Sequence, residues 1–157
     1  MPQLLGIGRI AAAIMLCAIS AIGSGAAIGG DLRRCVGNDA AATPSEVVDA
    51  QFAAYNARDL DAFAACYADS ITMVDLSGKN PVIDGKGALL KAFAYLAKPP
   101  KIAGTGVRII ERVVNGQIVV DKERPVGSPD GKYLPDLLAV YEVRDGSIVK
   151  VWFLPSR

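Results

Sequence analysis

Acidic residues are the side chains best suited to chemistry in this 157-residue chain, because the sequence contains no histidine. The absence of imidazole excludes Ser-His-Asp and Cys-His catalysis and zinc sites built on histidine. Asp75 follows Ile71 and Met73 at two-residue spacing on one face of a predicted strand. An apolar wall of this kind can raise the pKa of a carboxyl group into a range useful for proton transfer. The alternative, which the residues alone slightly favour, is that Asp75 caps the turn formed by residues 75–78.

A second acidic group stands in Asp121-Lys122-Glu123-Arg124. Strand alternation places Asp121 and Glu123 on one face and the two basic residues on the other. Glu123 is a candidate pocket acid, paired with Arg108 or Arg112 on the neighbouring strand. The alternative, which the residues alone favour, is ordinary cross-strand charge pairing on a solvated face.

Neither a metal nor a cofactor is expected. The acidic residues lack the spacing of a calcium-binding loop. Gly104-Thr105-Gly106 lacks the further glycine and the helix of a phosphate-binding loop.

Two cysteines, Cys35 and Cys66, follow the N-terminal apolar segment. They can pair in an oxidising compartment. However, Cys35 lies in a Gly/Ala-rich tail and Cys66 in a predicted helix, and nothing in the sequence brings them together. We therefore expect Cys66 to be buried and unpaired, packing as a small hydrophobic residue.

The first 26 residues have the order of an export signal. One charged side chain, Arg9, precedes an apolar run over residues 10–23, and small residues follow at Ser24 and Ala26. We expect cleavage after Ala26 and a periplasmic or secreted protein without a stable membrane span; an uncleaved anchor is the alternative. Residues 27–42 contain no aromatic residue and are expected to form a flexible linker to a domain over residues 43–157.

The charge balance argues against nucleic acid as a partner. The chain has 17 Lys and Arg against 16 Asp and Glu, a formal net charge of +1. Binding led by phosphate contacts needs a basic surface that this composition does not provide.

Hydrophobic spacing predicts helices in the first half of the domain and strands in the second. Helices are expected from Thr43-Pro44, from Asp59 to Tyr67, and from residues 84–87 to Leu96. Strands are expected over residues 71–76, 107–114, 117–124, 137–144 and 147–154, with tight turns at Asn115-Gly116 and Asp145-Gly146. The fold class is therefore α+β, with three helices covering one face of an antiparallel sheet.

Two motifs carry a family resemblance. The first is Tyr55-Asn56-Ala57-Arg58-Asp59-Leu60-Asp61, followed by Tyr67-Ala68-Asp69, and the second is Val140-Tyr141-Glu142-Val143-Arg144-Asp145-Gly146, followed by Val151-Trp152-Phe153. Together they resemble the nuclear transport factor 2-like superfamily, in particular its SnoaL-like and ketosteroid-isomerase-like branch. The resemblance implies a cone-shaped fold, in which helices wrap a curved sheet around a pocket for a small apolar molecule.

The resemblance also implies roles for particular residues. An ungapped alignment places Asp75 where ketosteroid isomerases carry their general base. The same alignment places Gln51 and Ala139 where those enzymes carry the tyrosine and the protonated acid of the oxyanion hole. Tyr55, one helical turn beyond Gln51, is a substitute donor if it points inward. Because an oxyanion-hole donor lowers the barrier by about 2.7–4 kcal/mol, these departures argue against efficient ketosteroid isomerisation.

The expected function is that of an exported pocket protein for a small apolar ligand, and the sequence leaves open whether Asp75 also serves as general base in isomerase- or cyclase-like proton transfer. The alternative is a noncatalytic ligand-binding or homodimeric interaction domain. Strand alternation directs Tyr141 and Phe153 toward the pocket and Trp152 toward the outer sheet face. Because the resembled proteins often dimerise through that face, Trp152 is either an interface residue or a ring half-covered by its neighbours. The complete set of expected binding residues is Gln51, Tyr55, Phe93, Glu123, Ala139, Tyr141 and Phe153.

Overall fold

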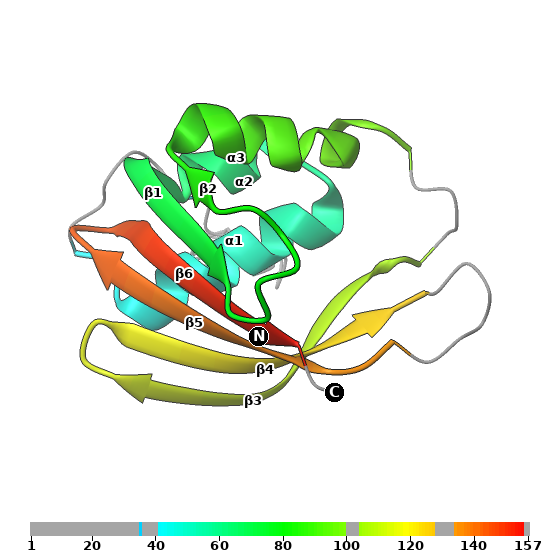
Figure 1. Cartoon of the computed structure of the whole chain (residues 1–157). Helices are drawn as coiled ribbons and strands as arrows, with labels where there is room; N and C mark the ends of the chain where they lie inside the picture. The colour runs from blue at the N-terminus through cyan, green and yellow to red at the C-terminus, as the bar shows by residue number, and fades with distance from the viewer. Residues whose placement is uncertain (1–34, 36–40, 100–103, 128–133, 156–157) are drawn as a thin grey trace, which may run out of the picture. The chain divides into compact units, whose positions relative to one another are not determined.

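The computed structural model describes residues 35, 41–99, 104–127 and 134–155 (Figure 1). The predicted signal peptide and most of the predicted linker lie outside these residues. Within the described part of the chain, no helix has the length and apolar character needed to cross a membrane.

Helix α1, Pro44–Ala57, begins as its sequence predicts. The Thr43 side chain accepts a hydrogen bond from the Glu46 backbone N–H, and the Glu46 carboxylate accepts one from the Thr43 N–H at 2.9 Å. This reciprocal pair satisfies two N–H groups that have no partner inside the helix.

The second and third helices are shorter than expected. Helix α2, Leu60–Ala65, is capped by Asp59 and ends before Tyr67, where strand β1 already begins. Tyr67 leaves the helix because its backbone pairs with Ile148 and its side chain is buried. Helix α3, Lys86–Ala92, is followed by a 3₁₀ turn, η1, over Ala94–Ala97.

Six strands form one sheet in the order β2-β1-β6-β5-β4-β3. Their bounds are Tyr67–Asp75, Ile83–Asp84, Gly106–Asn115, Ile118–Val126, Leu137–Arg144 and Ser147–Pro155 for β1 to β6. Neighbouring strands are antiparallel except β1 and β6, which run parallel. The predicted strands are confirmed, while the two-residue strand β2 and the parallel pair were not expected from the sequence.

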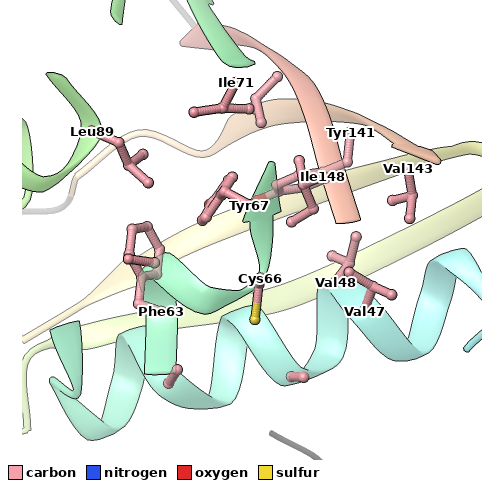
Figure 2. Close-up of a cluster of buried hydrophobic side chains, with 14 of the residues drawn as sticks. Val47, Val48, Phe63, Cys66, Tyr67, Ile71, Leu89, Tyr141, Val143 and Ile148 are labelled. Carbon is pink, nitrogen blue, oxygen red and sulfur yellow. The ribbon is translucent and has the colours of Figure 1, made fainter. Parts of the chain in front are cut away.

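The helices lie on one side of the curved sheet, and the main core fills the space between them (Figure 1). Figure 2 shows Val47 and Val48 of α1 close to the strands that carry Tyr141, Val143 and Ile148. The fold is therefore the α+β arrangement expected from the sequence, with its concave sheet face turned toward the helices.

A disulfide joins Cys35 to Cys66, with an S–S distance of 2.11 Å. The expectation of an unpaired Cys66 is therefore wrong, although Cys66 is completely buried as predicted. Cys66 caps the C-terminus of α2, and Cys35 packs against the same core, so the two Cα atoms lie 4.9 Å apart. The chain before α1 is thus tied to the core at Cys35.

Candidate functional site

A small cavity, which we call the inner chamber, lies between α1 and the concave face of the sheet. Its volume is about 120 Å³. All four phenylalanines and three of the five tyrosines of the protein contribute to its wall. The lining residues are Gln51, Phe52, Tyr55, Phe63, Tyr67, Phe93, Val107, Glu123, Leu137, Tyr141 and Phe153.

A wider cavity, the outer chamber, has a volume of about 570 Å³. Phe93, Leu137 and Phe153 line both chambers, so the two spaces adjoin at these side chains. The remaining wall of the outer chamber consists of Met73, Asp75, Asn80, Pro81, Ile83, Ala92 and Tyr95. The wall of the outer chamber is mainly apolar, and its polar residues are Asp75, Asn80 and Tyr95.

Glu123 and Tyr141 form the polar centre of the inner chamber. The Tyr141 hydroxyl donates a hydrogen bond to Glu123 Oε1 at 2.6 Å, and both side chains are buried. Burial raises the pKa of Glu123 to about 7; the Tyr141 hydrogen bond opposes this shift, Asp121 adds to it, and Arg112 opposes it. Burial also raises the pKa of Tyr141 well above its ordinary value. The pair therefore holds an acid that changes charge near neutral pH.

Asp121 and Glu123 lie on a buried face of the sheet, whereas the residues alone favour a solvated face. Both side chains face the core, at 0% and 5% exposure, and not a solvated face. Arg112 does form a cross-strand ion pair, but with Asp121, through two hydrogen bonds of 2.7 Å. Its remaining nitrogen contacts Asp49 and Ser45 on α1. The expected pairing of Glu123 with an arginine is therefore wrong, because α1 covers this face and engages Arg112 itself.

Gln51 brings a polar group from α1 into the same chamber. Its side chain is 5% exposed, and Oε1 has no hydrogen-bond partner among the described residues. Burial raises the pKa of Tyr67 well above its ordinary value, and a side-chain hydrogen bond with Gln51 opposes this shift. Gln51 therefore offers a buried, unpartnered acceptor at the cavity wall, which is costly unless a ligand satisfies it.

Asp75 lies in the wall of the outer chamber, at the end of β1. Its carboxylate accepts hydrogen bonds from Ser77 N and Oγ at 2.8 and 2.6 Å, and from Asn80 N and Nδ2 at 3.2 and 2.7 Å. The Ser77 bonds, followed by those of Asn80, lower its pKa. Of the two interpretations of Asp75, the structure shows the turn cap, and the hydrogen bonds of that turn outweigh the rise in pKa that desolvation would cause.

Comparison with known proteins agrees with this architecture. Residues 48–151 match the family model of the SnoaL-like domain. The chain belongs to the SnoaL-like domain family. No curated protein sequence matches the chain.

Solved structures resemble this SnoaL-like domain at low sequence identity. A putative polyketide cyclase from Sinorhizobium meliloti superposes with a TM-score of 0.57 at 21% identity, covering 69% of this chain and 94% of that one. An M. tuberculosis LEH-like epoxide hydrolase gives 0.58 at 18%, covering 72% and 82%. A hypothetical protein from Catenulispora acidiphila with a ketosteroid isomerase-like fold, in complex with trimethylamine, gives 0.58 at 20%, covering 73% and 88%. These likenesses establish the nuclear transport factor 2-like cone fold.

The structure of this SnoaL-like domain brings together six of the predicted binding residues in the inner chamber: Gln51, Tyr55, Phe93, Glu123, Tyr141 and Phe153. Ala139 is fully buried but lines neither chamber, because it lies between Asp121 and Phe153 in the sheet. The Tyr55 hydroxyl lies 3.1 Å from the Tyr95 hydroxyl and shares a hydrogen bond with it.

Tyr67 is a chamber residue that the sequence analysis missed. The helical spacing predicts the end of a helix at Tyr67, whereas the structure shows that Tyr67 is the first residue of β1. The two-residue spacing of Ile71 and Met73, extended backward, reaches Tyr67 through the exposed Asp69. This two-residue alternation could have predicted that Tyr67 faces the core. The charged Asp69 interrupts the run of apolar residues and hides the pattern.

Proposed function

We propose that this SnoaL-like domain binds a small molecule with an apolar body in the two adjoining chambers. The observation that carries the proposal is a cavity with an aromatic wall, in which the buried and hydrogen-bonded pair Glu123 and Tyr141 lies away from the outer chamber. Small-molecule sites commonly combine a mostly apolar surface with a few positioned polar groups. The outer chamber supplies the larger space for the body of the ligand.

Blocking the junction of the chambers tests this proposal. Leu137 lines both spaces, so Leu137→Trp is expected to fill their junction and weaken ligand binding at least tenfold. The matched control is Leu138→Trp, because Leu138 is 41% exposed on the opposite face of the same strand. Affinity for neutral and charged small molecules is measured by NMR titration. Equal weakening by both variants, or by neither, would remove the cavity as the binding site.

A second candidate function is proton transfer by Asp75, since its carboxylate lines the outer chamber. An assay for it follows isomerisation of a 5-ene-3-ketosteroid by absorbance. Asp75→Asn is expected to abolish turnover, because it removes the base. Ser77→Ala is expected to retain turnover, because it removes hydrogen bonds that lower the Asp75 pKa and leaves the base in place. Turnover unchanged in Asp75→Asn would exclude this role.

We further propose that the protein is exported, with cleavage after Ala26. The Cys35–Cys66 disulfide supports export, because disulfides persist mainly in oxidising compartments. The mass of the protein recovered outside the cytoplasm tests the cleavage site, and recovery only from the cytoplasm would contradict export.

A homodimer through the outer sheet face remains part of the proposal. Trp152 is half-buried on this face, with Val74 and Val140 as its neighbours in the register and the Lys150 ammonium 4.9 Å from its ring centroid. Partly exposed aromatic residues are common in interfaces. Sedimentation equilibrium distinguishes the dimer from a monomer, and a monomer mass at high protein concentration would contradict the proposed homodimer.

A further inference from the structure

Within the pocket proposed above, we propose that the inner chamber takes a protonated amine, held by the Glu123 carboxylate and surrounded by aromatic rings. The inference rests on the proposed function, because it names the chemical class of ligand for the same cavity. Its three supports are the charge of the chamber wall, the hydrogen-bonding groups left open in it, and the aromatic surface.

The wall of the inner chamber carries an acidic residue but, among the described residues, no basic one. Among the described residues that line the inner chamber, Glu123 is an acid and none is a lysine or arginine. Arg112 lies near enough to influence Glu123, but its guanidinium is bound to the carboxylates of Asp121 and Asp49. An ionised Glu123 therefore lacks a close cation of its own, and a buried carboxylate in this state is stabilised by a cationic ligand.

Two polar groups of the chamber wall offer acceptors to a ligand, the Glu123 carboxylate and Gln51 Oε1. Tyr141 already donates its hydroxyl hydrogen to Glu123. Gln51 Oε1 is an acceptor without a partner among the described residues. An ammonium group carries only donors, whereas a carboxylate or phosphate carries acceptors and would face an acid. The Glu123 carboxylate and Gln51 Oε1 can therefore both accept hydrogen bonds from a ligand that brings N–H groups.

The aromatic wall suits the same ligand. Phe63 stands at the centre of a ring cluster, with its centroid 4.8 Å from that of Phe93, 5.0 Å from that of Tyr67 and 5.9 Å from that of Tyr55. Ring faces carry negative electrostatic potential and attract organic cations. A chamber of about 120 Å³ has room for a small alkylammonium head, while an apolar body extends into the outer chamber.

A pair of ligands of equal shape tests the charge directly. We would titrate the full chain with tert-butylammonium and with its neutral counterpart tert-butanol, following the protein by NMR at pH 8. The cation is expected to bind at least tenfold more tightly. Glu123→Gln is expected to abolish this preference, because glutamine retains the shape and loses the charge. Glu111→Gln, which removes one exposed carboxylate from the sheet, is expected to retain the preference.

The pH profile of the wild-type protein is an independent readout that needs no variant. The groups that act on Glu123 are Asp121 on its own strand, Tyr141 on β5, Tyr67 on β1 and Arg112 on β3. Because the Glu123 pKa is raised to about 7, its charge develops between pH 6 and pH 8. Affinity for tert-butylammonium is expected to rise about tenfold over this interval, while affinity for tert-butanol stays constant.

The outcomes separate the two proposals. If tert-butanol binds as tightly as the cation and Leu137→Trp blocks it, the amine inference fails and the pocket stands. If neither ligand binds, both proposals fail for ligands of this size. A cation preference that survives in Glu123→Gln, or an affinity that does not change between pH 6 and pH 8, overturns the inference even if the pocket binds the ligand.

Discussion

Arg112→Leu is expected to destabilise the fold by about 3–5 kcal/mol, since it leaves the carboxylate of Asp121 buried without its partner. The Asp121 side chain is 0% exposed, and its two oxygens each accept a hydrogen bond of 2.7 Å from the guanidinium. Arg112 also links β3 to Ser45 and Asp49 on α1, so the substitution loosens the helix that closes the inner chamber. Urea denaturation followed by circular dichroism measures the loss.

Two further variants define the cause of that loss. The double variant Arg112→Leu/Asp121→Leu is expected to recover much of the stability, because replacing a whole buried ion pair by apolar residues is often close to neutral. Arg144→Leu is the surface control: Arg144 pairs with Glu142 and its side chain is 59% exposed, so about 0–1 kcal/mol is expected. If the double variant is as unstable as Arg112→Leu, the loss of stability comes from the lost contacts with α1 and not from the unpaired carboxylate of Asp121.

Removing the disulfide by Cys35→Ala is expected to cost about 3–4 kcal/mol and to lower Tm by roughly 10 °C or more. The bond joins residues 31 positions apart, and opening it restores conformational freedom to that loop in the unfolded chain. Differential scanning calorimetry measures the shift. Dithiothreitol is expected to lower the Tm of the wild-type protein and to leave the Tm of the variant unchanged. A wild-type Tm insensitive to reduction would contradict a stabilising bond.

Strand alternation was the most informative feature of the sequence. It predicted that Tyr141 and Phe153 face the pocket, and that Asp121 and Glu123 share one strand face. The choice of a solvated face for the two acids was wrong because alternation pairs residues on a face without showing what covers it. Here α1 covers them, and that contact depends on packing between distant segments.

The disulfide and the Asp75 turn show two further features that local sequence patterns do not predict. Cys35 and Cys66 are 31 positions apart, and the sequence before α1 carries no periodic pattern that predicts their contact. Asp75 fits two local patterns at once, the end of an apolar strand face and the cap of a turn. The structure shows the cap, with Ser77 and Asn80 as donors, while the catalytic role remains a proposal. Local spacing does not decide between patterns that share one residue.

Mapping the residues that a ligand contacts tests whether the inner chamber is the binding site. Backbone amide shifts recorded during a titration with tert-butylammonium are expected to change most at Gln51, Glu123 and Tyr141, which line the inner chamber. The competing surface is an open groove lined by Asp69, Lys86, Arg144 and their neighbours. Shifts confined to that groove, with the chamber residues unmoved, would contradict a ligand site built on Glu123.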